Sequence, residues 1–87
     1  MDIREAYQVI MDSGVVPSGM RLASAVAKDG GYCIAFSRRY DDESPIPGEH
    51  VVLFVGPGSS EPREIVNLSK EFFDALHCPP VDVSGLA

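Results

Sequence analysis

One tight turn constrains the fold of this chain more than any other feature of its sequence. Asp29, Gly30 and Gly31, which tolerate the positive φ angles of a hairpin turn, separate two runs of alternating side chains at 20–27 and 32–40. Alternation with a period of two is typical of strands. The sequence therefore predicts an antiparallel hairpin built from these two runs.

Signals for helices stand near both ends of the chain. Asp2 and Glu5 are typical of a helix N-terminus, and apolar residues follow at three-and-four spacing until Gly14. Ser69 predicts the cap of a second helix over 70–77, which Pro79 ends. Three large apolar residues of this second helix are expected to share one side: Phe72, Phe73 and Leu76.

Two more strands are expected between the helices. Residues 50–55 are apolar on both faces, which indicates a central strand, and residues 63–67 alternate. The order of elements predicts an α+β fold with an N-terminal helix, an antiparallel meander of three to four strands and a short C-terminal helix. The 87 residues predict a single domain over 1–78 and a C-terminal tail at 79–87, whose last seven residues, VDVSGLA, are expected to be loose.

The two faces of the predicted hairpin differ in side-chain size. The first strand is expected to turn Leu22 and Val26 toward the first helix, together with the large residues of the second strand. Small residues such as Ala25, Cys33 and Ala35 are expected on the other face. That face is either covered by the second helix or left as a platform for another chain.

The charge of the chain narrows the choice of partners. Thirteen acids against seven bases give a formal charge of −6, which repels nucleic acid and favours a basic protein partner or simple solubility. The longest apolar stretch falls short of the roughly 20 residues that cross a bilayer, and the acidic N-terminus is unlike a signal peptide. We expect a cytoplasmic protein with no membrane contact, whose two cysteines stay reduced.

The segment VVLFVGPGSSEPREIV, residues 51–66, is the one stretch whose composition raises the question of a reaction site. A phosphate-binding loop needs free amides at a helix start and, in its P-loop form, a Lys. Here Pro57 removes a donor, Glu61 adds a negative charge, and the residues that follow alternate like a strand. We therefore expect a hairpin connection.

Other candidates for chemistry are weaker still. Cys33, His50, His77 and Cys78 lack the spacing of a zinc site. Cys33 lies in the middle of a predicted strand, where apolar neighbours raise the pKa of a thiol and leave it inert. We expect no catalytic residue, no metal and no cofactor, and hence no enzyme.

The acidic connection between the second and third predicted strands offers a different kind of site. Asp41, Asp42, Glu43 and Glu49 gather there among prolines and a glycine. Such a segment is either a solvated loop or a surface that speeds the encounter with a basic protein. We take these four acids as the predicted partner-binding residues.

The layout of the chain resembles a known family. The strand GGYCIAF, the hairpin PIPGEHVVLFVGPGSSEPREIV and the helix LSKEFFDAL are similar to the YrhB-like small domain of the immunity protein 35 family, over residues 2–77. The resemblance implies a bacterial, non-enzymatic inhibitor that binds and neutralises a partner toxin. The alternative is a regulatory or small-ligand-binding domain with a shallow apolar pocket between sheet and helix.

Overall fold

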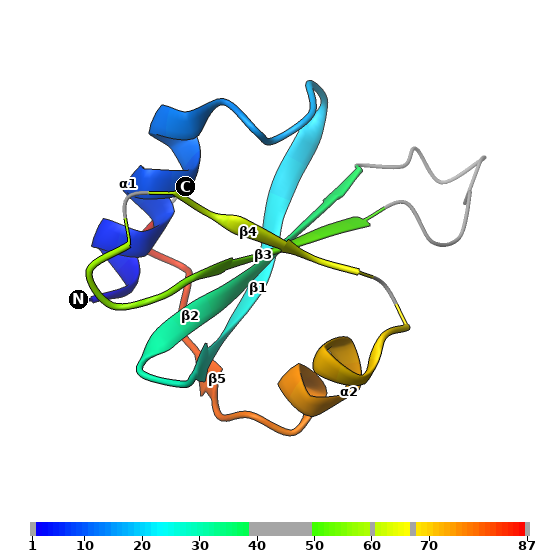
Figure 1. The fold of residues 1–87 in the computed structure, drawn as a ribbon. Coiled ribbons are helices and arrows are strands. Elements are labelled where there is room, and N and C mark those ends of the chain that lie inside the picture. Colours follow the sequence, from blue (N-terminus) through cyan, green and yellow to red (C-terminus); the bar gives the residue numbers. More distant parts are fainter. Residues whose placement is uncertain (1, 39–49, 60, 67, 87) are drawn as a thin grey trace.

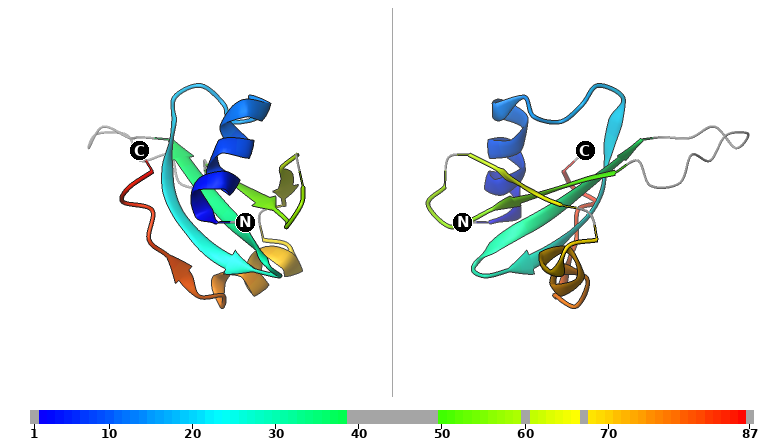
Figure 2. Two further views of the ribbon diagram at one scale, coloured as in Figure 1. Left: turned by 90° about the vertical axis from the view of Figure 1, so that its left-hand side faces the viewer. Right: turned by 45° about the vertical axis from the view of Figure 1, so that its right-hand side comes forward.

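The computed structural model describes residues 2–38, 50–59, 61–66 and 68–86 (Figure 1). Its strands form one antiparallel sheet in the order β4-β3-β2-β1-β5. Helix α1 packs against one face of this sheet and helix α2 against the other (Figure 2). The predicted α+β class is confirmed. The elements are α1 (Ile3–Ser13), β1 (Met20–Lys28), β2 (Gly31–Arg38), β3 (His50–Val55), β4 (Arg63–Ile65), α2 (Lys70–Leu76) and β5 (Pro80–Val81).

Helix α1 begins and ends where its caps predict. The Asp2 carboxylate accepts a hydrogen bond from the Glu5 amide at 2.8 Å, which satisfies one of the free donors of the first turn. Gly14 ends the helix in the left-handed conformation, with φ of 70°. Its buried residues are Ala6 and Ile10, so the stripe predicted from the sequence is the face that meets the sheet.

The β1–β2 turn uses its residues for two separate reasons. Asp29 and Gly30 both have positive φ, 50° and 80°, as a two-residue hairpin turn requires. Gly31 is buried beside β3, and a Cβ atom there would lie 2.1 Å from the carbonyl oxygen of Val55. The first two residues supply the turn, and Gly31 permits a close approach of two backbones.

A bulge in β1 changes which residues face which helix. The pairing with β2 shifts between Leu22 and Ser24, so the alternation restarts with the opposite phase. Val26, predicted to face α1 with Leu22, instead packs with Cys33 on the α2 side. Ala25, predicted on the small-residue face, is buried in the α1 core. The face assignment was therefore wrong for the second half of this strand.

The C-terminal residues are not the loose tail that the sequence predicts. Pro80 and Val81 form β5, whose partners in β1 are Val26 and Ala25. Val81 and Val83 are half-buried against the α1 core. Strand β4 is shorter than predicted and ends at Ile65. The packed unit therefore extends past residue 78.

The sheet separates two hydrophobic cores. The larger lies under α1 and includes Ile10, Ile34 and Phe36, each at most 2% exposed. The smaller lies under α2 and includes Cys33, Val52, Ile65 and Ala75. Strand β3 contributes to both cores and lies between β4 and β2, so it is an interior strand of the sheet, as its two apolar faces predict.

Candidate functional site

The predicted partner-binding acids, Asp41, Asp42, Glu43 and Glu49, lie outside the described residues. The structure places the elements on either side of them in the chain: β2 ends at Arg38 and β3 begins at His50. The role of the four acids therefore stays a prediction.

The loop after β3 is a hairpin connection, as predicted. It joins β3 to β4, and these two strands pair antiparallel through Val52–Phe54 and Arg63–Ile65. Gly58 supplies a positive φ of 74°. Because a strand and not a helix follows the loop, the segment has no helix N-terminus on which to seat a phosphate.

The two cysteines differ in burial. Cys33 is 3% exposed, and burial raises the pKa of its thiol to about 11, so it stays protonated near neutral pH. Cys78 is half-buried after α2, and both thiols are free. Among the described residues, no group of three or more His, Cys, Asp and Glu side chains is placed to hold a metal ion.

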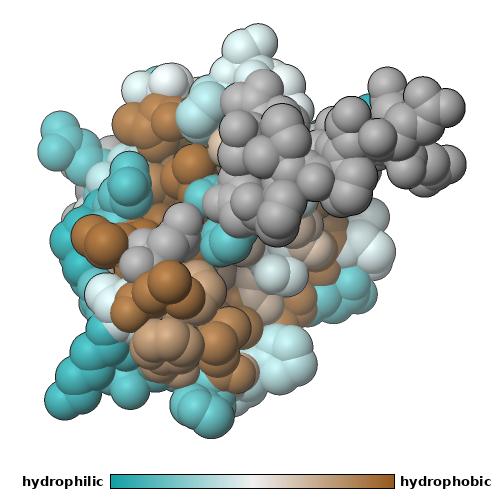
Figure 3. Space-filling view, turned by 90° about the vertical axis from the view of Figure 1, so that its right-hand side faces the viewer, coloured by the Kyte–Doolittle hydropathy of each residue, from teal (hydrophilic) through white to brown (hydrophobic). Residues whose placement is uncertain are grey.

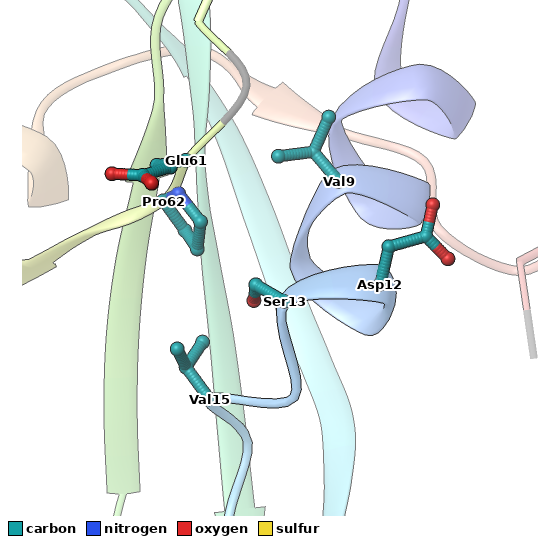
Figure 4. Close-up of a pocket in the computed structure, with 6 residues that line it drawn as sticks. All are labelled: Val9, Asp12, Ser13, Val15, Glu61 and Pro62. Carbon is teal, nitrogen blue, oxygen red and sulfur yellow. The ribbon is translucent and has the colours of Figure 1, made fainter.

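A hollow of about 540 Å³, which we call the acidic notch, separates the end of α1 from the loop between β3 and β4 (Figure 4). Val9, Val15 and Pro62 surround the space, and the carboxylates of Asp12 and Glu61 point outward on opposite sides of it. Asp12 accepts a hydrogen bond from Gln8. The sequence gives no sign of this site because its walls are some fifty residues apart and meet only in the folded chain.

The acids around this notch are available for contacts with another molecule. Within the part of the chain that the structure describes, Asp29 and Glu71 are the acids that form ion pairs. Asp12 and Glu61 form none there, and both are exposed. The notch therefore combines an apolar floor with uncompensated negative charge at its edges.

A second hollow, of about 250 Å³, lies between α2 and the sheet, and we call it the α2 groove. Ala35 and Val52 contribute to its floor, and Phe72 and Leu76 line it from α2. His50 lines it too, with its ring 6.1 Å from that of Phe72. The second helix thus covers part of the face for which the sequence left two alternatives open, and the rest of that face is an apolar groove.

An ion cluster holds α2 in place. The Arg63 guanidinium donates two hydrogen bonds to the Glu71 carboxylate, at 2.5 and 2.6 Å, and Lys28 approaches the same carboxylate at 3.4 Å. These cations hold the pKa of Glu71 at about 2, well below its ordinary value. Both cations also lie 5.3 Å from the centre of the Phe54 ring.

Exposed apolar side chains lie on α2 and just before it in the chain, and we call them the α2 patch (Figure 3). Of the three residues predicted to share a side of this helix, Phe72 turns toward the sheet, whereas Phe73 and Leu76 are 48% and 63% exposed. Phe72 and Leu76 both line the α2 groove, and the Phe73 ring lies 5.6 Å from that of Phe72, so the three share a side of α2 but only Phe72 packs against the smaller core. The members of the patch are Val66, Leu68, Phe73 and Leu76.

Comparisons with models of protein families, with curated proteins and with solved structures find no match to this chain. The resemblance to the immunity protein 35 family therefore stays a prediction. Among the described residues, no helix has the length and apolar character to cross a membrane.

Proposed function

We propose that this chain is a non-enzymatic protein-binding domain that recognises a basic protein partner. The observation that carries the proposal is the acidic notch, in which Asp12 and Glu61 flank an apolar floor. The formal charge of −6 supports it, since such a field attracts cationic proteins and repels phosphate backbones.

The notch suits the side chains of Lys and Arg in particular. These side chains have an apolar stem and a charged head, and they favour sites where the stem lies on apolar surface while the head stays near water. Val9, Val15 and Pro62 offer such a surface, with a carboxylate on either side. Exposed charges of this kind contribute more to the rate and specificity of association than to affinity.

The narrower form of the proposal is an immunity protein that neutralises a toxin encoded beside it. Its support is the sequence resemblance together with the acidic character of the chain. For a toxin that cuts nucleic acid, carboxylates would occupy the basic cleft that otherwise takes phosphates. Asp41, Asp42, Glu43 and Glu49, which lie outside the described residues, are proposed as further contacts with the partner.

The test begins with a pull-down from the native host at about 50 mM and about 500 mM salt, because screening weakens contacts between exposed charges. The captured partner is then purified and titrated with variants. We expect the double variant Asp12→Lys/Glu61→Lys to weaken binding by about tenfold or more at low salt. Asp74→Lys, a charge reversal at another exposed acid, on α2, is the control and should leave affinity within about twofold.

The predicted acidic segment is tested separately by reversing Asp41, Asp42 and Glu43 together. Unchanged affinity and salt dependence in this triple variant would remove that segment from the proposal. If the notch variant also binds as the unsubstituted chain does, the acidic contact itself is wrong.

The α2 groove favours a second candidate function, the binding of a small apolar ligand. Its 250 Å³ fall below the roughly 300–1,000 Å³ typical of sites for drug-sized ligands, so only a small molecule fits. A ligand that binds the folded state stabilises it by RT ln(1 + [L]/Kd), so the midpoint of thermal unfolding rises with the ligand concentration. A thermal-shift screen with short-chain apolar acids and alcohols therefore tests this alternative, and Ala35→Leu, which fills the groove, is expected to abolish any shift.

A further inference from the structure

We propose that residues 68–78, which include α2, form a strap that opens as a unit while the rest of the fold stays intact, and that Glu71 holds it closed. The strap crosses the face of the sheet opposite α1 (Figure 2). Strand β4 ends at Ile65 before it, and the Pro79 carbonyl after it accepts a hydrogen bond from the Ala27 amide at 2.9 Å. Both attachments lie outside the strap, so its opening leaves the pairing of the strands unchanged.

Among the described residues, the backbone of the strap makes no hydrogen bond to the sheet. Ser69 donates its N–H to the Val66 carbonyl, and its hydroxyl accepts from the Phe72 amide. The N–H groups of His77 and Cys78 bond to carbonyls of the last turn of α2. Helices shorter than about 12–15 residues are marginal in water without tertiary packing. Helix α2 therefore unfolds when it leaves the sheet, and its amides then exchange with solvent.

Little apolar surface holds α2 on the sheet. Ala75 is its buried residue, and Phe72 packs half-buried against the smaller core. Phe73 and Leu76 leave 48% and 63% of their surface exposed. Leu68, just before the helix, has a φ of 65°, a conformation that L side chains rarely adopt, so the closed strap also carries backbone strain. The larger core under α1 contains no residue of the strap and stays packed when it opens.

Glu71 supplies the ion pairs between α2 and the sheet. The Arg63 guanidinium donates two hydrogen bonds to its carboxylate, and Lys28 lies 3.4 Å from it. Because Lys28 belongs to β1 and Arg63 to β4, one carboxylate ties the helix to strands on both sides of β2 and β3. The Lys28 side chain, which also pairs with Asp29, is 10% exposed. No other residue of α2 forms an ion pair within the described parts of the chain.

Opening of the strap uncovers the face of the sheet beneath α2. Cys33, Val52 and Ile65 lie there, at 3%, 7% and 1% exposed in the closed form. The strap therefore controls access to an apolar surface that the closed form hides. Cys33 reports its opening, because a buried thiol reacts only after it reaches solvent.

Alkylation of Cys33 in the folded 87-residue chain measures the opening. Each protein carries Cys78→Ser, which leaves Cys33 as its single thiol. We expect Glu71→Gln to raise the rate of alkylation about fivefold, the factor that loss of a partly exposed ion pair produces. Asp74→Asn is the control, since this exposed acid of α2 forms no ion pair with any described residue, and it should change the rate by less than about twofold.

Urea separates opening of the strap from global unfolding, which Glu71→Gln also favours. Below the unfolding transition, alkylation of Cys33 and hydrogen exchange of the α2 amides should depend only weakly on urea, because opening exposes little surface. The amides of α1 should show the full dependence of global unfolding. Raising the salt from about 50 mM to about 500 mM should speed α2 exchange in the unsubstituted chain but not in Glu71→Gln.

Two results would overturn the proposal. One is an alkylation rate in Glu71→Gln that equals the rate of the chain with Glu71 intact. The other is a single urea dependence shared by the amides of α1 and α2, which would mean that the strap opens only when the whole chain unfolds. None of these measurements involves a partner, so their outcome is independent of the proposed function.

Discussion

The clearest prediction from this structure concerns Gly31, where glycine is required by proximity and not by φ. In Gly31→Ala the new Cβ atom would lie 2.1 Å from the carbonyl oxygen of Val55, more than 1 Å closer than the usual carbon–oxygen contact of about 3.3 Å. The other near atoms also belong to the backbone, at Val55 and Gly56. No side-chain rotation relieves this clash, so β2 and β3 must separate.

The loss in the free energy of unfolding can be worked out from the contacts that this separation breaks. Tyr32 and Val55 are the last partners of the β2–β3 ladder, and loss of their pairing costs about 1 kcal/mol per hydrogen bond. Val55 is 0% exposed. Full exposure of such a side chain costs about 1.5–3 kcal/mol, so partial exposure costs about 1–2 kcal/mol. We therefore expect Gly31→Ala to lower the free energy of unfolding by about 3 kcal/mol or more, a large part of the total for a domain of this size.

Thermal unfolding followed by circular dichroism measures this effect. The midpoint should fall by roughly 12–24 °C, given 4–8 °C per kcal/mol in small domains. Gly58→Ala is the matched control: its φ is 74°, but no atom lies within 4 Å of the added Cβ, so backbone strain alone should cost about 1 kcal/mol. If Gly31→Ala costs no more than Gly58→Ala, the close approach of β2 and β3 is refuted.

Three further predictions concern stability and reactivity. Glu71→Gln should lower the free energy of unfolding by only about 1 kcal/mol at neutral pH, since the partners of this carboxylate are partly exposed. The folded state lowers the pKa of Glu71 from 4.5 to about 2, so its contribution to stability is complete above pH 4.5 and is lost as the pH falls toward 2. Urea titrations across this pH range measure the loss. Alkylation at pH 8, followed by mass spectrometry, should modify Cys78 at least about tenfold faster than the buried Cys33. Truncation after Cys78 should cost about 2 kcal/mol in chemical denaturation, because β5 and the half-buried Val81 and Val83 are lost.

A different result would contradict each of these three predictions. An unchanged pH profile in Glu71→Gln would show that the ion cluster does not stabilise α2. Equal alkylation rates would mean that Cys33 opens to solvent more readily than its burial indicates. A truncated chain as stable as the full one would restore the original prediction of a domain that ends at residue 78.

The local features of this fold were predictable because neighbours in the chain determine them. Asp2 caps α1 and Ser69 caps α2, each through a hydrogen bond to an amide three residues away. The Asp29–Gly30 turn depends only on φ angles that these residues tolerate. Residues 50–55 are apolar on both faces, which indicates a strand that is covered on both faces, whatever the order of the strands in the sheet.

Other features of this protein were decided by the tertiary structure alone, because they depend on contacts between segments that are distant in the chain. The bulge in β1 could not be predicted because it lies in a run of Ala and Ser. Residues this small do not show which of them face the core, so the sequence does not reveal where the alternation shifts by one residue. Strand β5 forms at a proline because the chain returns alongside β1, where an edge strand tolerates the missing N–H. The acidic notch and the α2 patch arise in the same way: burial and exposure of a side chain are decided by which elements pack together, and an amino-acid pattern specifies only which faces are able to pack.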